Sequence, residues 1–355
     1  MRLRSTIIAG VAATAAVVAM ATPAVAAQTH TSRTHGDGKA LPTHVFAPYF
    51  ESFNGDDPAT ISGQSGARFL TMAFLQTAVA GSCTVDWNGD PGTPVAPSTF
   101  GAAITEIRAT GGDVIPSFGG FAADDTGTEL ADSCASVPAI AAAYENVVTT
   151  YHVTRLDLDT EDLSLSNPAG IDRRNKAIRL VEEWAAAHHR TVQFTYTLPT
   201  TPDGLAPSGL AVLQNAVANH ARVDIVNIMT FDYFDGLTHE MATDTMTAAA
   251  GLIGQLHTLF PHRSTAALWS MVGVTEMVGI DDFGPQETFT LADATAVQHW
   301  AVRHDISSLS FWAIERDNGS CPGLKGQGLC SGVDQTTWQF SHVFEPFTRN
   351  GHRHG

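Results

Sequence analysis

The chain has 355 residues, and its 36 acidic against 19 basic residues give a formal net charge of −17 at pH 7. This balance argues against nucleic acid or an anionic membrane as a partner, because phosphate groups are bound by clustered lysine and arginine. An uncharged or cationic polymer remains compatible with it.

The N-terminus has the pattern of a secretory signal peptide. Arg2 and Arg4 precede an apolar run over residues 7–20, and Ala24 and Ala26 form a small-x-small cleavage signal. We therefore expect a signal peptide over residues 1–27 and a secreted, extracellular protein. Polar composition predicts a disordered tail over residues 28–40 and a flexible tail over 348–355, which leaves one domain over 41–347.

The body of the chain alternates between short apolar segments and segments with helical periodicity. The predicted strands are 44–50, 68–75, 113–118, 155–161, 191–198, 224–231, 266–273 and 307–313. The predicted helices are 59–65, 102–109, 137–151, 171–188, 210–220, 247–259, 291–303 and 335–344. Ser136 is the expected N-cap of the third helix, and Thr290 with Asp293 forms a variant capping box.

Eight strands alternating with helices predict an α/β fold, a single (β/α)8 TIM barrel. The main alternative is a doubly wound open sheet. That fold carries a glycine-rich phosphate loop after its first strand, whereas Tyr49, Phe50 and Glu51 stand there.

Four cysteines in a secreted chain predict two disulfides, for which three pairings are possible. Cys321 and Cys330 flank a glycine-rich loop and are expected to pair, which leaves Cys83 with Cys134. A zinc site is the alternative, but the chain has no Cys-x-x-Cys pair.

The most informative segment is 155–162, where Asp157, Asp159 and Glu161 alternate with apolar residues. In a strand the three acids share one face, at intervals of roughly 6.5–7 Å. Crowded carboxylates in a partly dry barrel favour a protonated acid near neutral pH, which a glycosidase uses to protonate a leaving oxygen. A solvated acidic strand is the simpler alternative. A calcium loop is a third, but it needs a glycine and more polar positions. The barrel pattern favours catalysis.

With these acids on the fourth predicted strand, residues 44–347 resemble the family-18 glycoside hydrolases, the chitinase family. Asp157, Asp159 and Glu161 match the last three positions of the family pattern Asp-x-x-Asp-x-Asp-x-Glu, and Thr154 replaces its first Asp. Residues 117–120 match a Ser-x-Gly-Gly motif, residues 227–233 resemble Met-x-Tyr-Asp, and residues 311–313 supply an eighth-strand Trp.

In the sixth-strand motif, Phe231 stands where the family has Tyr, and Tyr233 is the candidate replacement. The candidate substrate-binding residues are Tyr49, Ser117, Gly119, Tyr196, Met229, Asp232, Tyr233 and Trp312.

The resemblance implies retaining, substrate-assisted hydrolysis of β-1,4 bonds between N-acetylglucosamine units. Glu161 would be general acid and then base, Asp159 would hold the acetamido N–H, and Asp157 would lie behind Asp159. Chitin or its oligosaccharides would be the partner of a monomer, with no cofactor. No metal is expected, because the histidines lack His-x-x-x-His or Glu-x-x-His spacing.

The short segment 274–290 after the seventh strand leaves no room for the extra α+β module of some relatives, which predicts an open groove and endo cleavage. Two alternatives share the barrel. One is a non-catalytic chitin-binding protein, which usually lacks the Glu or its Asp partner. The other is an endo-β-N-acetylglucosaminidase acting on glycoprotein glycans, with specificity set by loops such as 81–98 and 121–133.

Overall fold

The computed structural model describes residues 40–326 and 328–350. The predicted signal peptide, residues 28–39 of the predicted N-terminal tail and residues 351–355 lie outside this range. Among the described residues, no helix combines the length and apolar character that a bilayer span requires.

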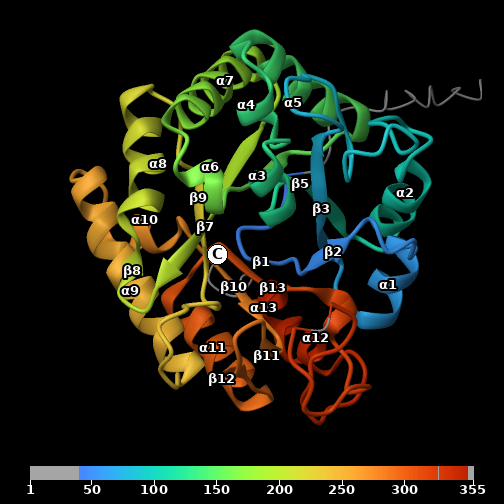
Figure 1. Ribbon diagram of the computed structural model, residues 1–355, viewed down its shortest axis with the longest axis vertical. Coiled ribbons are helices and arrows are strands. Elements are labelled where there is room, and N and C mark those ends of the chain that lie inside the picture. Colours follow the sequence, from blue (N-terminus) through green and yellow to red (C-terminus); the bar gives the residue numbers. More distant parts are fainter. Residues whose placement is uncertain (1–39, 327, 351–355) are drawn as a thin grey trace, which may run out of the picture. The chain divides into compact units, whose positions relative to one another are not determined.

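A ring of parallel strands in sequence order forms the centre of the fold (Figure 1). Its first strand consists of two pieces, β1 (Val45–Phe46) and β2 (Tyr49–Glu51). β1 pairs with the last strand and β2 pairs with the second, so the sheet closes on itself. The other barrel strands are β3 (Phe69–Thr77), β5 (Asp113–Gly119), β6 (Arg155–Asp159), β7 (Gln193–Thr201), β9 (Ile225–Met229), β10 (Val272–Met277) and β13 (Ser308–Trp312). The predicted (β/α)8 barrel is confirmed.

Helices surround this ring and bury its outer face (Figure 1). They are α1 (Pro58–Ser65), α2 (Gly101–Ala109), α5 (Val137–Tyr151), α7 (Pro168–Ala187), α8 (Pro207–Ala218), α9 (Met241–Leu259), α11 (Leu291–His304) and α12 (Gln339–Phe344). Ser136 caps α5 by accepting from the Ala139 N–H at 3.3 Å, and Thr290 forms the expected capping box with Asp293. Caps mark these two boundaries because they satisfy N–H groups left without helical partners.

Shorter elements lie between the barrel strands and the main helices or at the end of the chain's described part. They are β4 (Val85–Trp87), α3 (Phe121–Thr126), α4 (Leu130–Ser133), α6 (Asp162–Leu165), β8 (Gly204–Leu205), α10 (Thr265–Trp269), β11 (Gly279–Asp281), β12 (Gly284–Phe289), the 3-10 helix η1 (Ile314–Arg316) and α13 (Pro346–Asn350). Several of them, including α3, α6 and the β11–β12 hairpin, come directly after carboxyl ends of barrel strands, where TIM-barrel active sites lie.

Several predicted boundaries are wrong, and in two places the structure assigns a segment to another kind of element. The seventh strand was expected over 266–273, but α10 occupies Thr265–Trp269, capped by Ser264, and the strand begins at Val272. A short apolar run does not distinguish strand from buried helix. The C-terminal tail was expected from residue 348, but α13 continues to Asn350, and the Thr348 hydroxyl accepts a 2.8 Å hydrogen bond from the Phe46 N–H.

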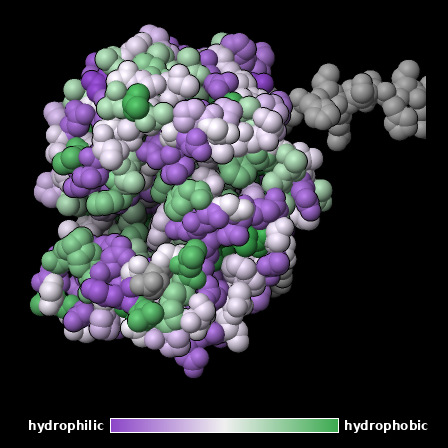
Figure 2. Space-filling view, turned by 45° about the vertical axis from the view of Figure 1, so that its right-hand side comes forward, coloured by the Kyte–Doolittle hydropathy of each residue, from purple (hydrophilic) through white to green (hydrophobic). Residues whose placement is uncertain are grey.

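Both predicted disulfides are present. Cys83, after β3, pairs with Cys134 at the end of α4, and Cys321 pairs with Cys330. The first bond therefore ties a loop after the second barrel strand to the segment after the third. On the surface, hydrophilic and hydrophobic residues are interspersed over the visible face (Figure 2).

Candidate active site

The three predicted acids lie together at the carboxyl end of β6, between β5 and β7. Asp157 and Asp159 are almost fully buried, with 2% and 4% of their surface exposed. Glu161 follows the strand and keeps an extended backbone, with φ −130° and ψ −179°. The side-chain alternation therefore continues through Glu161, and the solvated-strand alternative does not fit this burial.

Three hydroxyl groups fix the carboxylate of Asp157. Tyr49 and Ser117 donate to its Oδ2 at 2.9 and 2.6 Å, and Thr197 donates to Oδ1 at 2.6 Å. Burial raises the pKa of Asp157, but these bonds act in the opposite direction, because they stabilise the charged form. Tyr49 and Ser117, expected to contact substrate, thus hold Asp157 in place.

Asp159 has a different environment. Its Oδ1 has no hydrogen-bond partner among the described residues. Burial raises the pKa of Asp159 well above its ordinary value, and the charges of Glu161, Asp157 and Asp124 raise it further. Asp157 has three donors that stabilise its charged form, whereas the unpartnered oxygen of Asp159 has none, so the environment of Asp159 raises its pKa more strongly.

Glu161 titrates near neutrality. Burial raises its pKa to about 7, against the opposing effect of a hydrogen bond from the Phe121 backbone N–H. A carboxyl group with this pKa can both donate and accept a proton under mild conditions, as a general acid and base must.

A fourth acid, Asp124 of α3, was missed by the sequence analysis. Its carboxylate accepts a hydrogen bond from the Glu161 backbone N–H, and only 1% of its surface is exposed. Burial raises the pKa of Asp124 to about 9, and the nearby Glu129 adds to the effect. The only signal in the sequence was its place in the 121–133 segment directly after the Ser-x-Gly-Gly motif.

The two glycines of that motif permit close packing beneath the acids. A Cβ on Gly119, whose φ is +98°, would lie 2.0 Å from the Asp159 carbonyl oxygen. A Cβ on Gly120 would lie 2.6 Å from the ring of Phe74. Gly119 is therefore a packing position against β6, in line with the expected close approach of backbone.

An aromatic cluster lies beside the acids. Trp312 ends β13 and is half-buried, and its ring stacks on Phe74 at 5.7 Å and 10°. Tyr49 packs against Trp312 at 5.8 Å. The partly exposed Trp312 is suited to contact an apolar sugar face. Phe74 was not predicted, because nothing in its strand distinguishes it from core residues.

The sixth-strand residues divide into two groups. Met229 lies at the end of β9 on the same face as Asn227, whose amide donates to Thr197 at 3.0 Å inside the barrel. Asp232 lies beyond the strand, next to Asp281, and its backbone N–H donates to Asp281 at 3.3 Å. Burial and the charge of Asp281 raise the pKa of Asp232 to about 8.

Two predicted tyrosines are not brought to the β6 acids. The Tyr196 hydroxyl contacts Asn175 of α7 at 3.2 Å, because Tyr196 faces outward while Thr195 and Thr197 face the interior. The expectation that it binds substrate is wrong. Tyr233 packs against His239 at 4.9 Å, and Glu276 of β10 is the charge that most raises its pKa, so these neighbours of Tyr233 lie in the loop after β9 and in β10.

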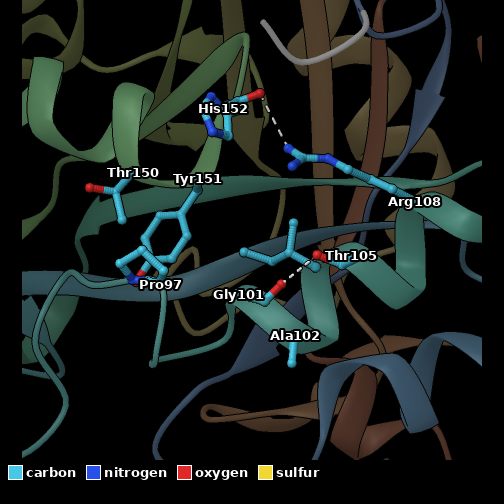
Figure 3. A pocket seen from close by; sticks show the side chains of 9 residues that line it. Pro97, Gly101, Ala102, Thr105, Arg108, Thr150, Tyr151 and His152 are labelled. Carbon is cyan, nitrogen blue, oxygen red and sulfur yellow. Dashed lines mark hydrogen bonds between the residues drawn. The ribbon is translucent and has the colours of Figure 1, made fainter. Parts of the chain in front are cut away.

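A cavity of about 390 Å³ lies elsewhere, between α2 and the end of α5 (Figure 3). The Arg108 side chain within it already binds Asp113 at 2.8 Å and the His152 carbonyl at 3.2 Å. Its charge is thus engaged within the fold, and the cavity is separate from the β6 acids.

A closed (β/α)8 barrel with three aligned acids at the end of its fourth strand, one of them titrating near pH 7, defines a glycoside hydrolase. No family model matches the chain. It is 30% identical to the catalytic domain of a hyperthermophilic chitinase from Pyrococcus furiosus, with a TM-score of 0.77, over 88% of this chain and 98% of that one. The chain belongs to the chitinase family, family 18 of the glycoside hydrolases.

Two curated proteins are also similar. A probable bifunctional chitinase/lysozyme of Escherichia coli is 31% identical over 88% of this chain. Endochitinase 11 of Metarhizium anisopliae is 31% identical over 79% of this chain. The matches span 35% and 53% of the lengths of these two relatives.

Proposed function

We propose that the protein hydrolyses β-1,4 linkages in chitin or in N-acetylglucosamine oligosaccharides. The observation that carries the proposal is the difference among three aligned acids. Asp157 is held by three hydroxyl donors, Asp159 has an unpartnered oxygen, and Glu161 has a pKa of about 7. The similar Pyrococcus furiosus domain has also been determined with chito-oligosaccharides, which supports the same substrate class here.

In the proposed reaction Glu161 donates its proton to the glycosidic oxygen as that bond breaks. The acetamido oxygen of the substrate attacks the anomeric carbon and forms a cyclic oxazolinium ion, so the configuration is retained when water later opens it. Glu161 then removes a proton from this water. The substrate thus supplies the nucleophile, and no carboxylate attacks the sugar.

Asp159 has the second role. Its unpartnered oxygen can accept the acetamido N–H, and its negative charge balances the developing oxazolinium ion. The positive intermediate itself lowers the pKa of Asp159, because an opposite charge favours the ionised form. Asp157, fixed by three donors, keeps Asp159 in place from behind.

Endo cleavage by a secreted monomer completes the proposal. The segment between β10 and α11 forms only the two-stranded β11–β12 hairpin, which supports an open groove that accepts internal linkages. The two disulfides support secretion, because such bonds persist in oxidising compartments.

The deciding experiment compares hydrolysis of chitotriose, colloidal chitin and an N-glycosylated protein by the wild type, Glu161→Gln and a control variant. We expect turnover of the two chitin substrates, internal cleavage products at early times, and at least a 1000-fold loss in Glu161→Gln. Glu183→Gln is the matched control, since that exposed side chain pairs with Arg179 on the surface of α7. Release of N-glycans in place of chitin cleavage would identify a glycoprotein-directed enzyme, and binding without turnover by the wild type would identify a non-catalytic protein.

A further inference from the structure

Three side chains with metal-binding atoms converge beside the rim of the barrel. Asp235 and His239 lie in the loop after β9, and Glu287 lies in β12. One ligand atom from each lies within 4.8 Å of the others. A histidine nitrogen with two carboxylate oxygens is a donor set suited to a divalent transition metal.

Both ring nitrogens of His239 face carboxylate oxygens. Its Nδ1 lies 2.7 Å from the carboxylate of Asp244, at the start of α9, and its Nε2 lies 2.9 Å from Oδ1 of Asp235. When Nδ1 carries the hydrogen toward Asp244, the lone pair of Nε2 faces the Asp235 oxygen. Two acceptors at this distance require a proton or a cation between them, and a carboxylate that orients the distal nitrogen is typical of metal sites.

Glu287 adds a buried carboxyl group to the same place. Only 2% of its surface is exposed, and its Oε2 accepts the Tyr233 N–H at 2.8 Å. Asp281 lies next to Glu287 and shares a side-chain hydrogen bond with it. The acids facing this point therefore come from the β9–α9 loop, from α9 and from the hairpin. A buried carboxylate is costly without a compensating cation.

We propose that Asp235, His239 and Glu287 bind one divalent transition-metal ion, with Zn²⁺ as the probe of that class. The nitrogen ligand disfavours Ca²⁺ and Mg²⁺, which prefer oxygen donors. Three protein ligands leave a coordination position for solvent. The ion would connect the loop that contains Asp232 to the hairpin that contains Asp281, and so fix the segments that follow β9 and β10 relative to each other.

The test measures Zn²⁺ binding to the metal-stripped full chain by titration calorimetry, for the wild type, His239→Ala and Glu287→Gln. Glu287→Gln retains an oxygen that can accept the Tyr233 N–H, so it removes charge with little change in shape. His257→Ala, an exposed position on α9, is the matched control. His30, His35, His352 and His354 are present in every variant, so any Zn²⁺ that they bind cancels in the comparison.

We expect the wild type and His257→Ala to bind one more Zn²⁺ per chain than His239→Ala and Glu287→Gln. We also expect Zn²⁺ to raise the melting temperature of the first pair by several degrees more. Co²⁺ should give visible absorption bands in the wild type that Glu287→Gln lacks. If His239→Ala does not fold, Asp235→Asn replaces it, because the Asp235 side chain is exposed. Equal stoichiometry in all variants would show that His239 is a protonated partner of two carboxylates and overturn the proposal. Displacement of Zn²⁺ by equimolar Ca²⁺ would overturn the assigned metal class.

Discussion

Tyr49 and Asp157 are joined by a 2.9 Å hydrogen bond across the barrel, from the first strand to the fourth. β3 and β5 separate their strands in the sheet, so the bond crosses the barrel interior. The Tyr49 ring also packs against Trp312. One residue thus connects the aromatic cluster to the innermost acid.

Tyr49→Phe should lower kcat for chitotriose by about 10- to 100-fold with little change in KM. The substitution keeps the ring and removes one of three donors to a buried carboxylate, a bond worth about 1.5–3 kcal/mol. Tyr144→Phe is the control, because the buried Tyr144 hydroxyl has no partner among the described residues. Equal kcat values for both variants would show that the Tyr49 hydroxyl does not act through Asp157.

The activity should fall as the pH rises through about 7, where Glu161 loses its proton. A carboxylate cannot donate to the glycosidic oxygen, so the alkaline side of the kcat/KM profile reports this pKa in the free enzyme. A kcat/KM–pH profile on a soluble oligosaccharide measures it. A profile that stays flat to pH 9 would contradict the role of Glu161 as acid.

The raised pKa of Glu161 also makes the stability of the fold depend on pH. The direction is opposite to that of an ion-paired acid, whose pKa is lowered on folding. The pKa of Glu161 rises from 4.5 to about 7 on folding, so between these values the folded chain binds more protons than the unfolded chain. The free energy of unfolding therefore decreases as the pH rises through this window. We expect Glu161→Gln to gain on the order of 1–3 kcal/mol relative to the wild type between pH 4 and pH 8, measured by denaturant unfolding. Glu183→Gln should gain nothing.

Sequence reasoning predicted the barrel, both disulfides and several helix starts, but it did not predict the contacts that depend on how neighbouring strands and loops pack. The starts of α5 and α11 agree with prediction because Ser136 and Thr290 are their N-caps. Each accepts a hydrogen bond from the backbone N–H three residues further on. The sequence did not show which side chains of β7 face the barrel interior, because threonine and tyrosine are each compatible with the interior or with the helix-covered face. Only pairing with β6 places the threonines inside.

In the candidate site, too, the residues aligned within one strand were predicted, and those brought in from other segments were not. Strand alternation alone aligned Asp157, Asp159 and Glu161, because it is a local property. Asp124 reaches the site through a contact between residues 37 positions apart in the sequence. The proposed metal ligands likewise come from two segments, the loop after β9 and β12, so no single spacing motif contains all three.

Gly119→Ala should abolish most activity and destabilise the fold, whereas Gly63→Ala should do neither. The added methyl group of Gly119→Ala would meet the Asp159 carbonyl at 2.0 Å, at a φ of +98°. Relief requires a shift of β6, and such strain costs about 1–3 kcal/mol or more. Gly63 lies in α1 with nothing within 4 Å of its Cβ position. Activity and denaturation midpoints of both variants test this, and a fully active Gly119→Ala would show that β6 tolerates displacement.

Trp312→Ala should raise KM for chito-oligosaccharides by about 10-fold, because loss of an aromatic platform removes on the order of 1 kcal/mol of stacking. Trp184→Ala on α7 is the control, since that ring packs against His188 on the outer layer. An unchanged KM for Trp312→Ala would place the sugar platform elsewhere.

Asp124→Asn tests whether the acid missed by the sequence acts as a neutral group. The pKa of Asp124 is raised to about 9, so at pH 7 this residue holds a proton and has the charge of asparagine. The amide oxygen of Asp124→Asn can still accept the Glu161 N–H. We therefore expect kcat within about 5-fold of the wild type, as for other replacements that keep charge and hydrogen bonding. Asp159→Asn, which removes a charge needed by the intermediate, should lose at least 100-fold. Equal, large losses of kcat in both variants would contradict a neutral Asp124. They would show that Asp124 is ionised during the reaction and shares the negative charge with Asp159.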